Sequence, residues 1–424
     1  MTEASDRHAE FVSRLRDAGS ASERILEAFE RVPRHLFLPK VSLDAAYADD
    51  AIVTHDEGGV PTSSSSQPSL MARMLEQLQL QAGDRVLEIG AGTGYNAALM
   101  AELGAAVTTV ELQPAVADAA REHLLAAGVE LAAAPPAEPA RAGASSAAAT
   151  GAVAEGASAE AAAAAPGSVL VVTGDGAAPP GGPYDRIIIT AGCWALPGPV
   201  VDALADGGVL VAPLRVNGVE LALGLRRQGD VLRGSGAIPC GFMPMRGGDQ
   251  RPWRWELGGG GLATADADLG VEGRGALDRL LAAPAQEVDD PLALQDGEHA
   301  LGALLWLGLQ GDPLLALVLP GSGNRPAWTL GLDVLPASLL VLELAPAFDT
   351  VASARLHGSE AALRTCVAAM AAWRAAGSPG PASLELTVER HDERGGWSLP
   401  YPIADGTATM VRGAHRWTLR YRTR

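Results

Sequence analysis

The sequence predicts an α/β fold in which a doubly wound parallel sheet is followed by a smaller α+β domain. Between residues 76 and 250, short runs rich in Val, Ile and Leu alternate with segments of helical periodicity. This order is typical of parallel strands connected by helices. A glycine-rich turn joins the first of these strands to a helix, and doubly wound sheets bind ligands at such turns. The chain has 424 residues, more than a single core usually holds, so we expect a second domain.

Residues 1–75 are predicted to form a helical cap and a polar loop that contacts substrate. Apolar residues recur at helical spacing between residues 7 and 37, and the prolines of RVPRHLFLP end this pattern. The segment GGVPTSSSSQP, residues 58–68, is then expected to be a loop with four consecutive serines. Pro68 suits the first turn of a helix, which SLMARMLEQLQL continues.

Residues 76–250 are predicted to form the parallel sheet and its helices. The predicted strands are RVLEI (85–89), AVTTVE (106–111), SVLVVTGDG (168–176), YDRIIITAG (184–192) and GGVLVAPL (207–214). The predicted helices are Tyr95–Leu103, Pro114–Ala127 and PGPVVDALA (197–205). An antiparallel pair over residues 221–238 is expected to close one edge. Residues 131–167 are alanine-rich and have no apolar stripe, so we expect a disordered insertion there.

The chain changes character after residue 250, where a Gly-rich stretch indicates a domain boundary. Residues 255–424 are predicted to form an α+β accessory domain. It contains a capped helix over Ser359–Ala376 and the alternating strands SLELTVER and HRWTLRYR. No catalytic motif is found in this part of the sequence.

Composition limits the partners and the compartment. The net charge is −18 and Lys40 is the only lysine, which argues against nucleic acid as a partner. No long apolar stretch predicts a membrane helix, and the polar N-terminus does not resemble a signal peptide. Three widely spaced cysteines fit the reducing cytoplasm. No metal-ligand spacing is found, so no metal is expected, and the oligomeric state stays open.

The glycine turn carries the first functional signal. Gly90, Gly92 and Gly94 follow the strand RVLEI at alternate positions, and their lack of side chains lets a ligand approach the backbone. A dinucleotide-binding turn would read GxGxxG and would hold a pyrophosphate. Glu88 precedes this turn, and its negative charge would repel phosphate. It would suit an ammonium group, such as that of the methionine part of S-adenosylmethionine (SAM).

Two further acidic residues are expected at the same edge of the sheet. Glu111, followed by Leu112, ends the second strand, where a carboxylate can accept hydrogen bonds from both ribose hydroxyls. Asp175, followed by Gly176, ends the third strand, where it could meet the adenine ring. Carboxyl ends of parallel strands face one ligand crevice. The sequence therefore predicts a SAM site and a Rossmann-like class I SAM-dependent methyltransferase fold; a nicotinamide site or a vestigial fold is the alternative.

With these motifs in place, residues from about Arg31 to about Gln250 resemble the protein-L-isoaspartate O-methyltransferase family. The resemblance rests on SSSQP (64–68), VLEIGAGTGY, Glu111, GDG, YDRIIITAG and LADGGVLVAPL. It implies that Ser66 stands on the family's serine, with Ser64 second, as the residues that contact the acceptor. It also implies that Ser63, Ser65 and Ser66 lie beside the cofactor. FMPMRGGDQ looks like the family's closing segment, with Arg246 in place of threonine.

PTSSSSQPS, TAGCW, CGFMPMRG and the additional domain look like the peptide-tailoring branch of this family. That branch is associated with lanthipeptide and graspetide clusters, including the FxLD system. The resemblance implies methylation of an Asp side chain in a ribosomally made precursor peptide, after which the ester collapses to an aspartimide that can hydrolyse to isoaspartate. Repair of isoaspartyl residues in damaged proteins is the first alternative. A SAM-binding regulator without enzymatic activity is the second.

A carboxylate acceptor fits the residues of this sequence. A carboxylate is already ionised near neutral pH, so no general base is needed. Methyl transfer then depends mainly on alignment of donor and acceptor. Serine hydroxyls can orient the carboxylate without holding it in a tight ion pair, as a lysine would.

Overall fold

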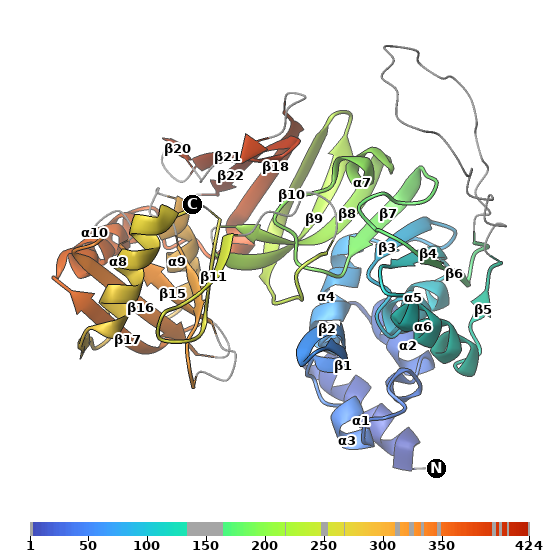
Figure 1. The fold of residues 1–424 in the computed structure, drawn as a ribbon. Helices are drawn as coiled ribbons and strands as arrows, with labels where there is room; N and C mark the ends of the chain where they lie inside the picture. Colours follow the sequence, from blue (N-terminus) through green and yellow to red (C-terminus); the bar gives the residue numbers. More distant parts are fainter. Residues whose placement is uncertain are drawn as a thin grey trace, which may run out of the picture.

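The fold of the chain is taken from a computed structural model (Figure 1). It describes residues 3–133, 164–216, 218–246, 253–266, 268–309, 314–321, 326–331, 335–345, 349–391, 396–397, 401–404 and 407–422. Most of the predicted insertion, 131–167, and part of the Gly-rich boundary lie outside the described residues. Among the described residues, no helix combines the length and the apolar character needed to cross a membrane.

A large mixed sheet forms the centre of the molecule, and its parallel part confirms the prediction of a doubly wound sheet. Parallel strands run in the order β5, β6, β4, β3, β7, β8. Their bounds are Glu130–Leu131, Ser168–Thr173, Ala106–Glu111, Arg85–Ile89, Tyr184–Ile189 and Leu204–Val216. The connecting helices are α5 (Tyr95–Glu102), α6 (Pro114–Ala126) and α7 (Gly198–Asp202). Antiparallel β9 (Val219–Gln228) and β10 (Val231–Pro239) follow β8.

Both faces of this sheet are buried, which explains why its strands read as continuous apolar runs. Val86 and Ile188 belong to the core formed with α4 (Pro68–Leu78), α5, α6 and the N-terminal helices. Their neighbours Leu87 and Ile187 belong to the core on the other face. Because successive side chains of a strand point to opposite faces, each strand supplies residues to two cores.

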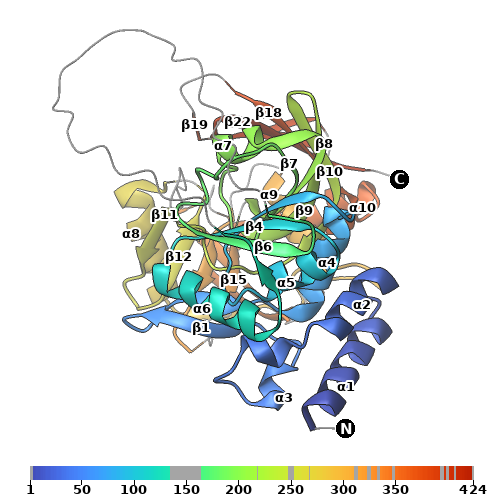
Figure 2. The same cartoon turned by 90° about the vertical axis from the view of Figure 1, so that its right-hand side faces the viewer.

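The N-terminal segment packs against the first of these cores (Figure 2). Its helices are α1 (Glu3–Asp17), α2 (Glu23–Arg31), the short η1 (Arg34–Phe37) and α3 (Leu43–Ala46). The expectation of a loop over residues 58–68 was wrong in part. Residues 52–65 form an antiparallel hairpin, β1 (Ile52–Glu57) and β2 (Val60–Ser65). Its turn holds Gly58 and Gly59 at φ +63° and +84°, a backbone that tight hairpins favour.

The C-terminal part continues the central sheet. The sequence predicted that the pair β9–β10 closes one edge of the sheet. This prediction was wrong, because β18 (Leu384–Arg390) pairs with β10. The sheet then runs through β22 (His415–Tyr421) and β21 (Thr407–Gly413) to β19 (Gly396–Trp397), and β20 (Tyr401–Ala404) pairs with β21. Figure 1 shows these strands in red beside the green β10. The domain boundary near residue 255 stays a prediction, and the sheet crosses it.

A second, antiparallel sheet carries the rest of the C-terminal part. Its strand order is β11 (Trp253–Glu256), β12 (Leu262–Ala265), β14 (Ala316–Val318), β15 (Pro326–Leu330), β16 (Ser338–Leu344), β17 (Val351–Gly358) and β13 (Ala285–Glu287). Its helices are α8 (Gly270–Ala282), α9 (Ala300–Leu309) and α10 (Ala361–Ala375), and η3 (Pro381–Ser383) precedes β18.

Two buried polar contacts connect this sheet to the central one. The guanidinium of Arg412 on β21 pairs with Asp266 at 2.9 Å. The Trp328 indole on β15 donates to the carbonyl of Gly218, 3.1 Å away, between β8 and β9.

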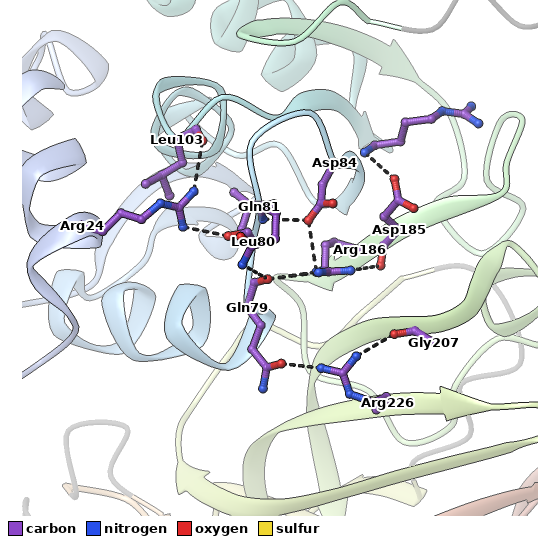
Figure 3. A network of polar contacts seen from close by, with 11 residues as sticks. Arg24, Gln79, Leu80, Gln81, Asp84, Leu103, Asp185, Arg186, Gly207 and Arg226 are labelled. Carbon is purple, nitrogen blue, oxygen red and sulfur yellow. Dashed lines mark hydrogen bonds and ion pairs between the residues drawn. The ribbon is translucent and has the colours of Figure 1, made fainter.

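A network of arginines stabilises the amino end of the parallel strands (Figure 3). Arg24 donates to the carbonyls of Leu80 and Leu103 at 2.7 and 3.2 Å. Arg186 on β7 contacts the Gln79 carbonyl and the Asp84 carboxylate. These contacts hold the ends of α4 and α5 against the sheet. The predicted ligand site lies at the opposite, carboxyl end of the strands.

Candidate active site

Most of the residues predicted to form the site surround one cavity of about 1030 Å³ at the carboxyl ends of β3 and β4. Of the predicted site residues, the wall includes Ser64, which was predicted to contact the acceptor, and the predicted cofactor residues Ser63, Ser65, Ser66, Glu88, Gly90, Gly92, Glu111, Leu112 and Gly176. Residues 242–246, which follow β10, complete the wall.

The glycine turn has the backbone that the motif predicts. Gly90, Gly92 and Gly94 have φ values of +98°, +52° and +87°, which glycine adopts without strain. A Cβ atom on Gly90 would lie 2.6 Å from the Thr190 hydroxyl, and one on Gly92 would lie 3.1 Å from the Ser64 carbonyl. The turn and the serine strand therefore approach each other closely across the cavity. Gly94 is the N-cap of α5 and lies outside the cavity wall.

Glu88 is fully buried at the cavity wall. One carboxylate oxygen accepts from the Asn96 amide and the other from the Thr109 hydroxyl, each at 2.7 Å. Burial raises the pKa of Glu88 to about 7, against the opposing effect of these two hydrogen bonds, and the nearby Glu111 adds to the increase. The carbonyl oxygen of Asn96 is buried without a hydrogen-bond partner among the described residues. A positively charged ligand group fits this place, because it would lower the cost of the buried charge.

Glu111 connects β4 to the glycine turn. Its carboxylate accepts from the backbone N–H groups of Gly92 and Gln113, at 3.2 and 3.1 Å. The Gln113 side chain also exchanges two hydrogen bonds with Thr62 on β2, both at 3.2 Å. Sequence reasoning did not identify Thr62 or Gln113, because neither carries a motif. Their contact fixes the serine strand against the cofactor side of the sheet.

The structure places Asp175 differently from the other predicted residues. Asp175 is exposed, and its carboxylate accepts from the Ala177 backbone N–H at 2.9 Å. It lies outside the residues that line the cavity, whereas its neighbour Gly176 lines it. A Cβ atom on Gly176 would lie 2.3 Å from the Ile89 side chain. The role of Asp175 at the adenine ring stays a prediction.

The four serines separate into two pairs, because side chains alternate along a strand. Ser63 and Ser65 are buried; the hydroxyl of Ser63 accepts from Thr54 at 3.4 Å and that of Ser65 from Arg34 at 3.3 Å. Ser64 and Ser66 are half-buried, and their hydroxyls make no hydrogen bond to described residues. The pair Ser64 and Ser66 is therefore the one with hydroxyls available to a ligand.

Arg34 supports the serine segment from behind. Its side chain is fully buried and donates to the backbone carbonyls of Ala46 and Ser66, at 2.9 and 3.0 Å. Burial lowers the pKa of Arg34. The short helix η1 places Arg34 under the hairpin, where carbonyl groups replace its water.

A second cavity of about 690 Å³ adjoins the first. Ser64, Ser66 and Phe242 line both cavities. The rest of the second wall consists of Ala51, Gln67, Ser69, Leu70, Arg73, Pro239, Cys240 and Gly241. The serines selected from sequence as contacts of the acceptor thus lie on the boundary between two compartments. That position suits groups that orient one ligand toward another. Within the described residues, no group of His, Cys, Asp and Glu gathers as a metal site.

Comparison with known proteins agrees with this site. Residues 6–250, more than half of the chain, match the family described as protein-L-isoaspartate(D-aspartate) O-methyltransferase (PCMT). The chain belongs to this family. It is 37% identical over 249 residues to the protein-L-isoaspartate O-methyltransferase of Methanoculleus marisnigri, covering 57% of this chain and 91% of that one. It is 32% identical over 250 residues to that of Roseiflexus sp., covering 58% and 95%.

Two of the solved structures that match this chain have related names. A protein-L-isoaspartate O-methyltransferase has a TM-score of 0.48 and 22% identity, covering 90% of this chain and 96% of that chain. One from Plasmodium falciparum, in complex with S-adenosyl-L-homocysteine, has a TM-score of 0.42 and 15% identity, covering 56% and 98%.

Membership of the PCMT family establishes the general chemistry. The protein is a SAM-dependent carboxyl O-methyltransferase, and its cofactor is SAM. The prediction of a Rossmann-like class I SAM-dependent methyltransferase fold is confirmed. The finer assignment to the peptide-tailoring branch rests on the resemblance alone.

Proposed function

We propose that the protein methylates the free carboxylate of an L-isoaspartyl residue in a peptide or protein. The observation that carries this proposal is the wall that Ser64, Ser66 and Phe242 share between the cofactor cavity and the second cavity. The second cavity would hold the acceptor residue. The curated relatives, which are named for isoaspartate methylation, support the same acceptor.

The chain's own residues mainly position and align the reactants. When bound, SAM supplies a methyl group on a positively charged sulfur. The Ser64 and Ser66 hydroxyls would donate hydrogen bonds that orient the acceptor carboxylate, which attacks as the anion and needs no base. The products are the methyl ester and S-adenosylhomocysteine. Alignment of this kind supplies about 7–11 kcal/mol of a barrier in favourable cases.

The contacts of the cofactor cavity support a division of roles. Glu88 and the free carbonyl oxygen of Asn96 would surround the ammonium group of the cofactor. Glu111 would accept from the ribose hydroxyls at the end of β4. Ser63 and Ser65 would act through the shape of the hairpin, because Thr54 and Arg34 occupy their hydroxyls.

A second candidate function is methylation of an α-linked Asp in a modified precursor peptide, leading to an aspartimide. The observation that favours it is the C-terminal part, which lies beyond the family match and extends the sheet through β18, β22 and β21. A repair enzyme that accepts many chains has no evident need for this extension. A dedicated peptide partner would use it.

One experiment separates the candidates. The full chain is incubated with SAM and either an isoaspartyl peptide, its α-aspartyl twin of the same sequence, or a ring-containing Asp peptide, and methyl ester is measured by mass. Transfer to the isoaspartyl peptide alone supports the first function. Transfer to the ring-containing Asp peptide alone supports the second. Transfer to none of them contradicts both.

A further inference from the structure

The segment that follows β10 lies between the sheet and the cofactor cavity. We call residues 240–246 the strap. Its backbone exchanges hydrogen bonds with Gly192, from Gly192 N–H to the Met243 carbonyl at 2.8 Å and from Met245 N–H to the Gly192 carbonyl at 2.9 Å. Near its start, the Cys240 N–H donates to the Glu220 carbonyl at 3.1 Å. Because the strap lines the cofactor cavity and Phe242 lines both cavities, its position defines their common wall.

Glu220 on β9 makes a second contact with the strap through its side chain. One carboxylate oxygen accepts from the Phe242 backbone N–H at 2.6 Å. The carboxylate is buried, and it fits only because residue 192 is glycine: a Cβ atom there would lie 2.6 Å from Oε2. Glu220 lines neither cavity. It therefore acts on the ligands only through the strap.

The other partners of Glu220 hold it less closely. The Arg215 guanidinium on β8 is 3.9 Å from Oε2 and stacks on the Trp194 ring, 5.1 Å from its centroid. The Cys240 thiol is 4.0 Å from Oε1. A buried carboxylate is costly unless hydrogen bonds compensate it. The short contact with Phe242 is the strongest of those present, because hydrogen bonds to charged acceptors are the strong ones.

We propose that Glu220 is a positioning residue, whose buried carboxylate holds Phe242 and the strap in the place that closes the cofactor cavity beside the acceptor. The inference rests on the cofactor site and on the proposed acceptor cavity. Its direct consequence concerns the cofactor: without this contact Phe242 loses the partner of its N–H, the strap keeps only its other contacts, and the cofactor binds less tightly.

The contact gives a pH dependence of known sign. Burial raises the pKa of Glu220 to about 7, and the Arg215 charge and the Phe242 N–H oppose the increase. The other titratable groups near it are the thiols of Cys193 and Cys240, whose pKa values are raised by burial, and Arg254 on β11, which faces Arg215. Below pH 7 the carboxyl is protonated, so its attraction for Arg215 and the Phe242 N–H weakens. Cofactor affinity is expected to fall as the pH decreases through 7.

The test uses the full chain and three proteins: wild type, Glu220→Gln and Glu220→Met. Calorimetry measures S-adenosylhomocysteine binding at pH 6, 7 and 8, and hydrogen exchange reports on residues 240–246 at pH 7. We expect wild-type affinity to fall about fivefold from pH 8 to 6. Glu220→Gln keeps an acceptor for the Phe242 N–H, and its cofactor affinity changes less with pH than that of wild type. The pH dependence that remains in this variant comes from Glu88. Glu220→Met binds about tenfold more weakly at every pH and exchanges faster in the strap.

Two outcomes would overturn the inference. One is that Glu220→Met binds S-adenosylhomocysteine as tightly as wild type and shows the same hydrogen-exchange protection of the strap. The other is that the affinity of Glu220→Gln depends on pH as strongly as that of wild type. The second outcome decides the question even if Glu220→Met does not fold. Binding of S-adenosylhomocysteine does not depend on the acceptor. Failure to methylate isoaspartyl peptides would therefore contradict the proposed function and leave this result intact.

Discussion

The two ends of the parallel strands use charge in opposite ways. At the amino end, Arg24, Arg186 and Arg226 donate to main-chain carbonyls that end helices and turns (Figure 3). At the carboxyl end, Glu88 and Glu111 are buried beside each other, and they accept from a side-chain amide, a hydroxyl and the N–H groups of a glycine turn.

The difference shows which end is built for stability and which for binding. Arginines that satisfy carbonyls at helix ends stabilise the fold. Two neighbouring buried carboxylates destabilise it, because each charge loses water and repels the other. An arrangement that costs stability persists where a ligand needs it.

The largest expected effect comes from filling the gap between the glycine turn and the serine strand. In Gly92→Val, the new side chain would enter the space where a Cβ already lies 3.1 Å from the Ser64 carbonyl. We expect cofactor binding to fall by about 1000-fold, beyond the range of calorimetry. Gly207→Val is the matched control, because Gly207 also has positive φ, +74°, but has open space around it at the other end. Equal losses in both variants would show that backbone strain alone is responsible.

The next effect concerns the pH dependence of stability. The pKa of Glu88 is about 7 in the folded protein and 4.5 ordinarily, so the folded state binds the proton more tightly. The resulting stabilisation is complete below pH 4.5 and is lost as the pH rises through 7, a change on the order of 3 kcal/mol. Urea unfolding at pH 5 and 8 should therefore show a smaller difference for Glu88→Gln than for wild type. Identical differences would contradict the buried, proton-binding state of Glu88.

The serine pair is expected to affect turnover more than cofactor binding. Ser66→Ala and Ser64→Ala each remove a hydroxyl from the wall between the two cavities. We expect kcat to fall about 10- to 100-fold while the KM for SAM stays within about twofold. Ser65→Ala removes a hydroxyl that faces Arg34 instead, so it should lower the unfolding free energy by about 1 kcal/mol. A kcat loss as large in Ser65→Ala would argue against the division into two pairs.

The smallest effect is expected for Asp175→Asn. Its carboxylate is exposed, so a hydrogen bond from the adenine ring would compete with water. We expect cofactor affinity to fall by about fivefold at most. A loss near 100-fold in a titration with S-adenosylhomocysteine would show that Asp175 turns into the cavity when the cofactor is bound.

The predictable part of the site is local in sequence. The strand RVLEI, the turn from Gly90 to Gly94 and the helix after it follow from residue type and periodicity, and the structure confirms all three. Glu111 could be placed because the end of a parallel strand marks the ligand edge. Asp175 was expected to end the third strand, but β6 ends at Thr173 and Asp175 lies two residues beyond it, outside the cavity wall. Side-chain direction after a strand depends on the following turn.

The contacts that build the common wall could not be read from the sequence. Gln113 is hydrogen-bonded to Thr62, 51 residues away in sequence, and Arg34 to Ser65, 31 residues away. The periodicity of apolar residues does not predict such pairs. The strand β18 joins β10 although more than 140 residues, which include the strands of the second sheet, separate the two strands in sequence.

By itself, the sequence determined the α/β alternation, the positive-φ glycines and the acidic residues at strand ends, because each depends on the preferences of neighbouring residues. Only the tertiary structure decided that the serine segment is a strand, that Glu220 supports the strap and that the C-terminal part extends the central sheet. Those features depend on contacts between residues that are distant in sequence, and these contacts form only when the whole chain packs.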